Sequence, residues 1–326
     1  MSYYKGKNVL VAGGTGLIGN PLVDMLVEQG ANVRVASLDD RSRARPGIEF
    51  YQTDLTDYTN CREVCKGMEH VFNLLCIKGT VKTAKETPAR FMVPMIAFDA
   101  NLIRAARDSG VEKYLYSSSV GIYPPAEVFY EDEGLKNPPS ENYKFPAWAK
   151  RVGEFECQAY HEEGWNKIAI VRPASTYGPH DNFAEGNAMV IASLTRDVME
   201  GKNPLVIWGD GSDIRDFVHS RDVARGMMLA LEKSPGAYLP MNLAGGREYT
   251  IKELAETIQK NAPSKIEIVW DTTKPSGDKR RVMDISRAGE ILGWKPEVSL
   301  EEGIKEVMTW YISNIKSIKK SYKFLE

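Results

Sequence analysis

A run of glycines near the N-terminus has the spacing of a phosphate-binding loop. Gly13, Gly16 and Gly19 lie between an apolar strand predicted for Asn8 to Ala12 and an amphipathic helix predicted for Asn20 to Glu28. The first glycine permits a tight turn, the second lets a pyrophosphate approach the backbone, and the third lets the helix pack on the strand. Free N–H groups at the start of the helix would bind phosphate oxygens. An ordinary turn is the alternative, but this position favours a dinucleotide cofactor.

The residues after the second predicted strand bear on which dinucleotide binds. An acidic residue at the end of that strand would accept a hydrogen bond from the ribose 2′-OH of NAD, whereas this chain has Ser37 there. Arg41 and two further arginines follow, and a guanidinium together with Ser37 would bind a 2′-phosphate. Asp39 and Asp40 oppose this, because their charge repels a phosphate. We therefore expect NADP, with NAD as the alternative.

The elements that would position these residues alternate along the chain. The predicted strands are Asn32 to Leu38, Ile48 to Gln52, His70 to Leu75, Lys113 to Ser117 and Lys167 to Arg172, and the predicted helices are Tyr58 to Cys65, Pro88 to Ser109 and Ala147 to Glu163. This alternation predicts an α/β fold with a Rossmann-type, doubly wound parallel sheet. From Pro179 the alternation loosens, which indicates a smaller C-terminal α/β lobe. We expect a dinucleotide-binding domain at 1–178 and a substrate lobe at 179–326, with the chain crossing back around 210–245.

Composition and charge exclude several classes of protein. The chain has 326 residues and a net charge of -2, so it lacks the basic field that binding to nucleic acid requires. Its longest apolar run, Phe91 to Phe98, is far shorter than the roughly 20 residues that span a bilayer. The start of the chain has no signal-peptide pattern, so we expect a cytoplasmic location. The four cysteines are too scattered for a disulfide framework or a metal site.

Several longer strings resemble one known family. They are Gly13 to Gly19, Ser117 to Ser119, Arg172-Pro173 leading to Tyr177 to Pro179, and Trp208 to Gly211 leading to Arg215 to Phe217. Together they resemble the extended short-chain dehydrogenase/reductases, the family of nucleotide-sugar epimerases, dehydratases and reductases. Tyr177 to Phe183 and Asp271 to Gly277 are most similar to the GDP-L-fucose synthase group. The resemblance covers nearly the whole chain and implies an NAD(P) cofactor and a nucleotide-sugar substrate, with a GDP-sugar favoured.

The resemblance also implies roles for individual residues. Ser119 matches the serine that hydrogen-bonds the reacting oxygen, and Lys150 matches the lysine that holds the nicotinamide ribose and lowers the pKa of a catalytic tyrosine. The expected cofactor contacts are Gly13, Thr15, Gly16, Leu17, Ile18, Gly19, Ser37, Arg41, Asp54, Leu55, Leu74, Lys150 and Pro173. The expected substrate contacts are Ser118, Asn182, Trp208 and Arg215.

The catalytic tyrosine itself is missing from its expected position. It would stand four residues before Lys150, where this chain has Pro146. Proline fits the first turn of a helix, so the substitution removes the acid without disturbing the fold. Tyr143, in the loop just before, is the candidate replacement, and Tyr123 or a bound water are the alternatives.

A second departure concerns epimerisation. The cysteine acid of the GDP-L-fucose synthases falls at Gly121, while their histidine is kept as His180. His180 has either a catalytic or substrate-binding role, or a structural one in its turn. Because one proton-transfer group is absent, we expect reduction, oxidation or a single-centre reaction instead of double epimerisation.

Two classes of function and one assembly state follow. The chain is expected to be an NAD(P)-dependent oxidoreductase or epimerase; the alternative is a degenerate relative that binds NAD(P) as a sensor or partner subunit. The helices predicted at Pro88 to Ser109 and Ala147 to Glu163 are apolar on more than one face. The resemblance implies that they pair across a two-fold axis, so we expect a homodimer.

Overall fold

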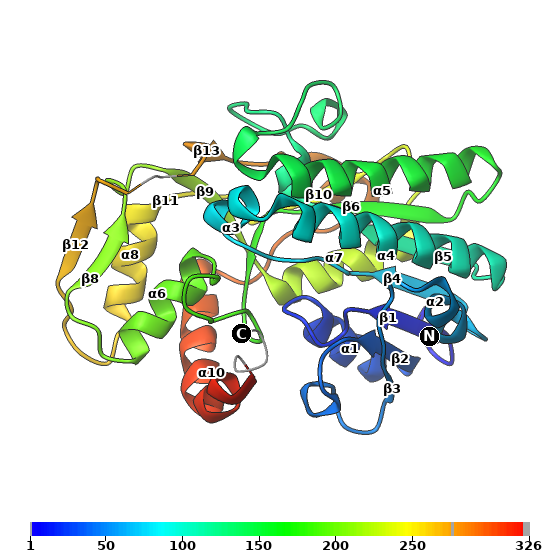
Figure 1. Ribbon diagram of the computed structural model, residues 1–326, viewed down its shortest axis with the longest axis horizontal. Coiled ribbons are helices and arrows are strands. Elements are labelled where there is room, and N and C mark those ends of the chain that lie inside the picture. The colour runs from blue at the N-terminus through cyan, green and yellow to red at the C-terminus, as the bar shows by residue number, and fades with distance from the viewer. Residues whose placement is uncertain (1, 275–276, 322–326) are drawn as a thin grey trace.

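A seven-stranded parallel sheet forms the centre of the molecule (Figure 1), in the order β10-β6-β5-β4-β1-β2-β3. The computed structural model describes residues 2–274 and 277–321. The strands of this sheet are β1 (Asn8–Ala12), β2 (Asn32–Ser37), β3 (Glu49–Gln52), β4 (His70–Asn73), β5 (Lys113–Ser117), β6 (Ile168–Pro173) and β10 (Met241–Leu243). The predicted doubly wound, Rossmann-type sheet is therefore confirmed.

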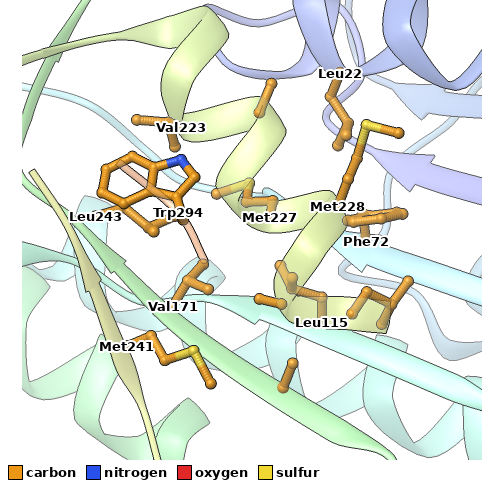
Figure 2. Packing of buried hydrophobic residues seen from close by; sticks show 14 of the residues in the cluster. Leu22, Phe72, Leu115, Val171, Val223, Met227, Met228, Met241, Leu243 and Trp294 are labelled. Atoms are coloured by element: carbon orange, nitrogen blue, oxygen red, sulfur yellow. The ribbon is translucent and has the colours of Figure 1, made fainter. Parts of the chain in front are cut away.

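Helices cover both faces of this sheet, each over its own apolar core. One face carries α2 (Tyr58–Cys65), α4 (Pro88–Asp108) and α5 (Lys144–Glu162), and the other carries α1 (Gly19–Glu28), α7 (Ser220–Lys233) and α9 (Ser286–Leu292). Figure 2 shows Met227 of α7 beside Trp294 and Leu243, so helices from late in the chain complete the core of the first sheet. Burying such side chains contributes about 1.5–3 kcal/mol each.

The remaining elements form a smaller lobe around a third core. Its strands are β7 (Ser175–Tyr177), β8 (Leu205–Trp208), β9 (Ile214–His219), β11 (Glu248–Thr250), β12 (Ile268–Asp271) and β13 (Arg280–Arg281), and its helices are α6 (Val190–Met199), α8 (Ile251–Lys260) and α10 (Leu300–Ser321). The chain leaves this lobe twice, once for α7 and β10 and once for α9. The second return was not predicted from the sequence.

Short helices lie in the segments that follow strands β2, β4 and β5 of the sheet. They are η1 (Arg41–Arg43), α3 (Val81–Glu86), η2 (Val120–Ile122), η3 (Glu131–Glu133) and η4 (Glu141–Tyr143). Pro146 lies in the first turn of α5, where proline is tolerated because the first N–H groups of a helix have no intrahelical partner. In the described part of the chain, no helix has the length and apolarity needed to cross a membrane.

Candidate functional site

The glycine loop lies at the switch point of the sheet, between the carboxyl ends of β1 and β4. Ligands of doubly wound sheets bind at this crevice. Gly13 has φ +83°, and a Cβ at Gly19 would come within 2.3 Å of the Gly13 carbonyl oxygen, so neither position accepts a side chain. At Gly16 a Cβ would meet only the Gly13 oxygen, at 3.5 Å, which leaves that backbone approachable.

The N-terminus of α1 is available to an anion. No side chain caps it, so its first N–H groups keep their capacity for phosphate oxygens. Asn20 braces the loop by donating from Nδ2 to the carbonyl oxygens of Thr15 at 2.6 Å and Gly16 at 3.2 Å. Leu17 is buried and Ile18 is half-buried beneath the loop. This cradle fits the pyrophosphate of a dinucleotide, and sequence reasoning missed the part played by Asn20.

The polar contacts at the end of β2 involve both an acidic and a basic side chain. The Thr15 hydroxyl lies 2.8 Å from Ser37 Oγ and donates to Asp39 Oδ2 at 2.6 Å. Arg43 donates to Asp39 Oδ1 at 3.1 Å. Arg41 points elsewhere, because its guanidinium donates to the Ile48 carbonyl oxygen at 2.9 Å. Arg43 is therefore held at Asp39, whose N–H donates to Ser37 Oγ at 3.1 Å, whereas the arginine expected to contact the cofactor was Arg41.

Lys150 is buried on α5 and points at the end of β4. Its Nζ donates to the Leu75 carbonyl oxygen at 2.8 Å and lies 3.7 Å from Asp99 Oδ2. The same atom lies 4.7 Å from the centre of the Tyr116 ring, a cation–π contact. The lysine is thus held rigidly beside the strand that adjoins the glycine loop.

The serines after β5 lie next to this lysine helix, since η2 packs against α5. Ser119 Oγ accepts a hydrogen bond from the Gly121 N–H at 3.1 Å, which leaves its own hydrogen free to donate. Ser118 Oγ is buried and has no hydrogen-bond partner among the described residues. A buried hydroxyl without a partner costs about 1–3 kcal/mol, and a ligand would remove that cost. Both serines therefore suit contact with a bound sugar.

Four further predicted cofactor residues follow strands of the same sheet. The Leu74 N–H donates to the Ala12 carbonyl oxygen, so this residue lies directly beside the glycine loop. Leu55 is buried after β3, and Asp54 Oδ1 accepts from both the N–H and the hydroxyl of Thr56. Pro173 is the last residue of β6. All four residues therefore lie at the carboxyl edge of the central sheet.

Buried ion pairing anchors the long segment between β5 and α5. Arg172 pairs with Glu154 through two hydrogen bonds of 2.9 and 2.7 Å, and both side chains are fully buried. Arg172 also donates to the Tyr123 hydroxyl at 2.9 Å, and that hydroxyl donates to Asn242 Oδ1 at 2.7 Å. Burial raises the Tyr123 pKa to about 12. Tyr123 is therefore a structural group, which removes it as an alternative proton donor.

Tyr143 faces the C-terminal lobe at the start of α5. The Arg281 guanidinium lies over its ring, 4.6 Å from the centre. Asp278 ties the two segments together: its Oδ1 accepts from Ser140 Oγ at 2.7 Å and from Asn142 Nδ2 at 2.8 Å, and its Oδ2 accepts from Arg281 Nη2 at 2.6 Å. The structure thus fixes Tyr143 where the lobe meets the sheet. Neither Arg281 nor Asp278 was predicted as a site residue.

Arg215 adds a second cation to this junction. Burial, and then the charge of the neighbouring Arg281, lowers the Arg215 pKa. Asp213 partly compensates, with Oδ2 3.6 Å from Arg215 Nη2. Neighbouring guanidinium groups can bind phosphate oxygens through their forks of N–H donors, although Arg281 already donates from Nε and Nη2 to Asp278 Oδ2.

Three further predicted site residues, His180, Asn182 and Trp208, belong to the lobe. His180 has φ +65°, and its ring packs on Trp310 with centroids 4.7 Å apart. Burial lowers the His180 pKa to about 4, so this imidazole is neutral near pH 7. Asn182 Oδ1 accepts from the Ala184 N–H at 2.9 Å, and Trp208 is 56% exposed on β8. Among the described residues no group of three or more His, Cys, Asp or Glu side chains could hold a metal ion.

Comparison with known proteins agrees with this geometry. Residues 9–244 match the NAD dependent epimerase/dehydratase family. The chain belongs to this family. It is 32% identical to GDP-L-fucose synthase 1 of Arabidopsis thaliana, over 95% of each chain, and 30% identical to the GDP-L-fucose synthase of Escherichia coli, over 94% of this chain and 97% of that one.

The fold is also similar to that of a solved epimerase structure over most of the chain. A UDP-glucose 4-epimerase from Thermotoga maritima, solved with UDP-glucose, superposes with a TM-score of 0.84 at 28% identity, over 94% of this chain and 99% of that one. The chain is thus one of the oxidoreductases and epimerases of nucleotide-sugar metabolism.

Proposed function

We propose that this chain transfers a hydride at a ring carbon of a nucleotide-activated sugar, with a GDP-sugar as its substrate class. The observation that carries the proposal is that α5 connects two candidate sites. Lys150 of this helix points at the end of β4, next to the glycine loop, and Tyr143 at its start contacts Arg281 of the lobe, whose charge acts on Arg215. The similarity to GDP-L-fucose synthases supports the GDP-sugar. We further propose that the boundary between the dinucleotide-binding domain and the substrate lobe lies between residues 178 and 179, and that the protein is cytoplasmic.

The residues divide the chemistry among them. A bound nicotinamide dinucleotide supplies or accepts the hydride. Arg215 and Arg281 bind the diphosphate of the substrate, and Ser119 donates a hydrogen bond to the reacting oxygen. Tyr143 exchanges the proton with that oxygen, and Lys150 holds the cofactor ribose and adds positive charge. These residues bind both partners and move one proton, which is what a reduction or oxidation requires.

Double epimerisation is not part of the proposal. Gly121 offers no acid, although an atom at its Cβ position would lie 3.4 Å from Ser119 Oγ, within the site. His180 packs on Trp310 and is neutral near pH 7. A ring carbon that is inverted needs a base on one face and an acid on the other, and this pair of residues does not supply both.

The function is tested by following the absorbance of NAD(P)H in the presence of GDP-, UDP-, dTDP- and CDP-linked sugars and their 4-keto forms. Chromatography of the products detects epimers. We expect a change with a GDP-sugar and none with Lys150→Ala. Turnover of UDP- or dTDP-sugars alone would contradict the GDP assignment. Binding of NAD(P)H without turnover of any of them would favour the alternative that Pro146 raises, a relative that binds cofactor as a sensor or partner subunit.

The cofactor is proposed to be NADP. Arg43, which pairs with Asp39 at the end of β2, supplies a positive charge that favours a 2′-phosphate, whereas the charge of Asp39 opposes it. We expect NADPH to bind more tightly than NADH, and Arg43→Ala to weaken NADPH by about 1.5–3 kcal/mol, the contribution of a hydrogen bond to a charged group. Arg41→Ala should have a smaller effect because its guanidinium bonds to Ile48. Titration by fluorescence measures this; tighter NADH binding would show that Asp39 decides the choice in favour of NAD.

We also propose a homodimer formed through α4 and α5. These helices pack side by side, and their outward residues include Val93, 66% exposed, and Phe155, 51% exposed. Large apolar side chains exposed in this way mark contact surfaces. Light scattering should give a dimer at micromolar concentration, and Val93→Glu with Phe155→Glu should give a folded monomer. A monomeric wild type would contradict the assembly.

A further inference from the structure

A carboxylate that no step above uses lies beneath Lys150. Asp99, in the middle of α4, is fully buried. Its Oδ1 accepts from Asn73 Nδ2 at 2.7 Å, and its Oδ2 accepts from the Tyr116 hydroxyl at 2.8 Å. The same Oδ2 is 3.7 Å from Lys150 Nζ, with both side chains no more than 3% exposed. Residues of α4, α5, β4 and β5 therefore meet at one buried charge pair.

Hydrogen bonds close this group into a ring around the end of β4. Asn73 Oδ1 accepts from the Leu75 N–H at 3.1 Å, and the Leu75 carbonyl oxygen accepts from Lys150 Nζ at 2.8 Å. The Tyr116 ring also lies against Nζ, 4.7 Å away at its centre. Asp99 is thus tied to the ammonium both directly and through Asn73 and Leu75. This arrangement leaves at least one of the three Lys150 N–H donors for a ligand.

Burial gives Asp99 a specific task. A lysine removed from water without an opposite charge tends to lose its proton, and its pKa falls by as much as 3–5 units. Position 146, one helical turn before Lys150, is a proline and offers no ionisable partner. Burial raises the Asp99 pKa, while Lys150, Asn73 and Tyr116 oppose that shift by stabilising the carboxylate. Asp99 is the only anion paired with Lys150 in the described part of the chain.

We propose that Asp99 is a positioning residue that keeps Lys150 protonated and aims it at the cofactor. Asp99 touches neither cofactor nor substrate, so it acts through the lysine alone. The inference rests on the proposed function in one respect only, that Lys150 holds a nicotinamide dinucleotide. Cofactor affinity, measured without any sugar, therefore tests it independently of the substrate.

Asp99→Asn removes the charge and keeps the size of the side chain. A lysine of ordinary pKa, about 10.4, whose pKa falls by about 2–3 units when a buried counter-charge is removed, is depleted of ammonium about 5- to 40-fold at pH 9 and hardly at all at pH 6. We therefore expect the ratio of the NADPH dissociation constants of Asp99→Asn and wild type to rise toward these factors at pH 9 and to stay near 1 at pH 6. A ratio of variant to wild-type dissociation constants that stays constant between pH 6 and pH 9 would overturn the proposal.

Other titratable groups face Asp99, and the controls separate them. They are Lys150, Glu156 and Cys157 from α5, and Tyr114 and Tyr116 from β5. Tyr116→Phe removes a hydrogen bond from the same carboxylate oxygen but keeps the charge of Asp99. The ratio of its NADPH dissociation constant to that of wild type should therefore not vary with pH. Glu156→Gln removes the neighbouring carboxyl, whose pKa burial raises to about 7, and should leave NADPH binding unchanged. A pH-dependent loss shared equally by Asp99→Asn and Tyr116→Phe would indicate a structural role and contradict the inference.

A measurement on the wild type covers the case in which Asp99→Asn does not fold. The ¹⁵N resonance of Lys150 Nζ, identified by its absence in Lys150→Arg, reports whether the group is an ammonium or an amine. At pH 9 we expect an ammonium. A neutral amine would overturn the proposal, whereas failure of the wild type to bind either NADPH or NADH would contradict the proposed function instead.

Discussion

Replacing Tyr143 by phenylalanine should lower turnover by about 10²–10⁴-fold and leave NAD(P)H affinity unchanged. This is the loss expected when a general acid is removed from its site. Tyr143 is the phenol that the structure presents at the junction of sheet and lobe, with the Arg281 guanidinium over its ring. Steady-state kinetics together with fluorescence titration of the cofactor measure both quantities.

Two further variants make the Tyr143 result specific. Tyr130→Phe removes a hydroxyl from the same segment, on a side chain that is 53% exposed, and should retain full activity. Pro146→Tyr restores a phenol one turn before Lys150; a rise in activity would show that the wild type uses a poor donor such as water. Full activity of Tyr143→Phe would contradict the assignment of this residue.

Breaking the buried pair of Glu154 and Arg172 should give the largest loss of stability. Both side chains are at most 2% exposed, and two hydrogen bonds join them. Glu154→Gln leaves the guanidinium buried without its counter-charge, which costs about 3–5 kcal/mol. Urea unfolding of the purified protein measures this free energy.

An exposed ion pair provides the control for Glu154→Gln. Lys136 Nζ lies 2.7 Å from Glu133 Oε1, with side chains 59% and 48% exposed. Glu133→Gln should change the free energy of unfolding by less than about 1 kcal/mol, because solvent screens such pairs. Equal effects of the two substitutions would show that the buried pair is replaceable, for example by water entering the site.

The sequence by itself determined the phosphate loop and every strand of the central sheet except β10. Strands such as Asn8–Ala12 and helices such as Tyr58–Cys65 were predicted from local apolar periodicity, and the glycine spacing identified the turn between β1 and α1. These signals are local, since the residues that produce them are near neighbours in the chain. The short strands β7, β9, β10, β11 and β13 and the helices α3, α6 and α9 were missed, because elements of so few residues show little periodicity.

Only the tertiary structure decided which polar groups act together. Asp99 meets Lys150 because α4 packs on α5. Arg281 reaches Tyr143 because β13 of the lobe, more than a hundred residues later in the chain, lies against the start of α5. It also separated Tyr123, held in a buried hydrogen-bond network, from Tyr143 at the junction. Likewise, it placed the Arg43 guanidinium at Asp39 and the Arg41 guanidinium at the Ile48 carbonyl oxygen. Residue type and spacing carry no information on such pairings, because they depend on which faces of distant elements bury their apolar side chains against one another.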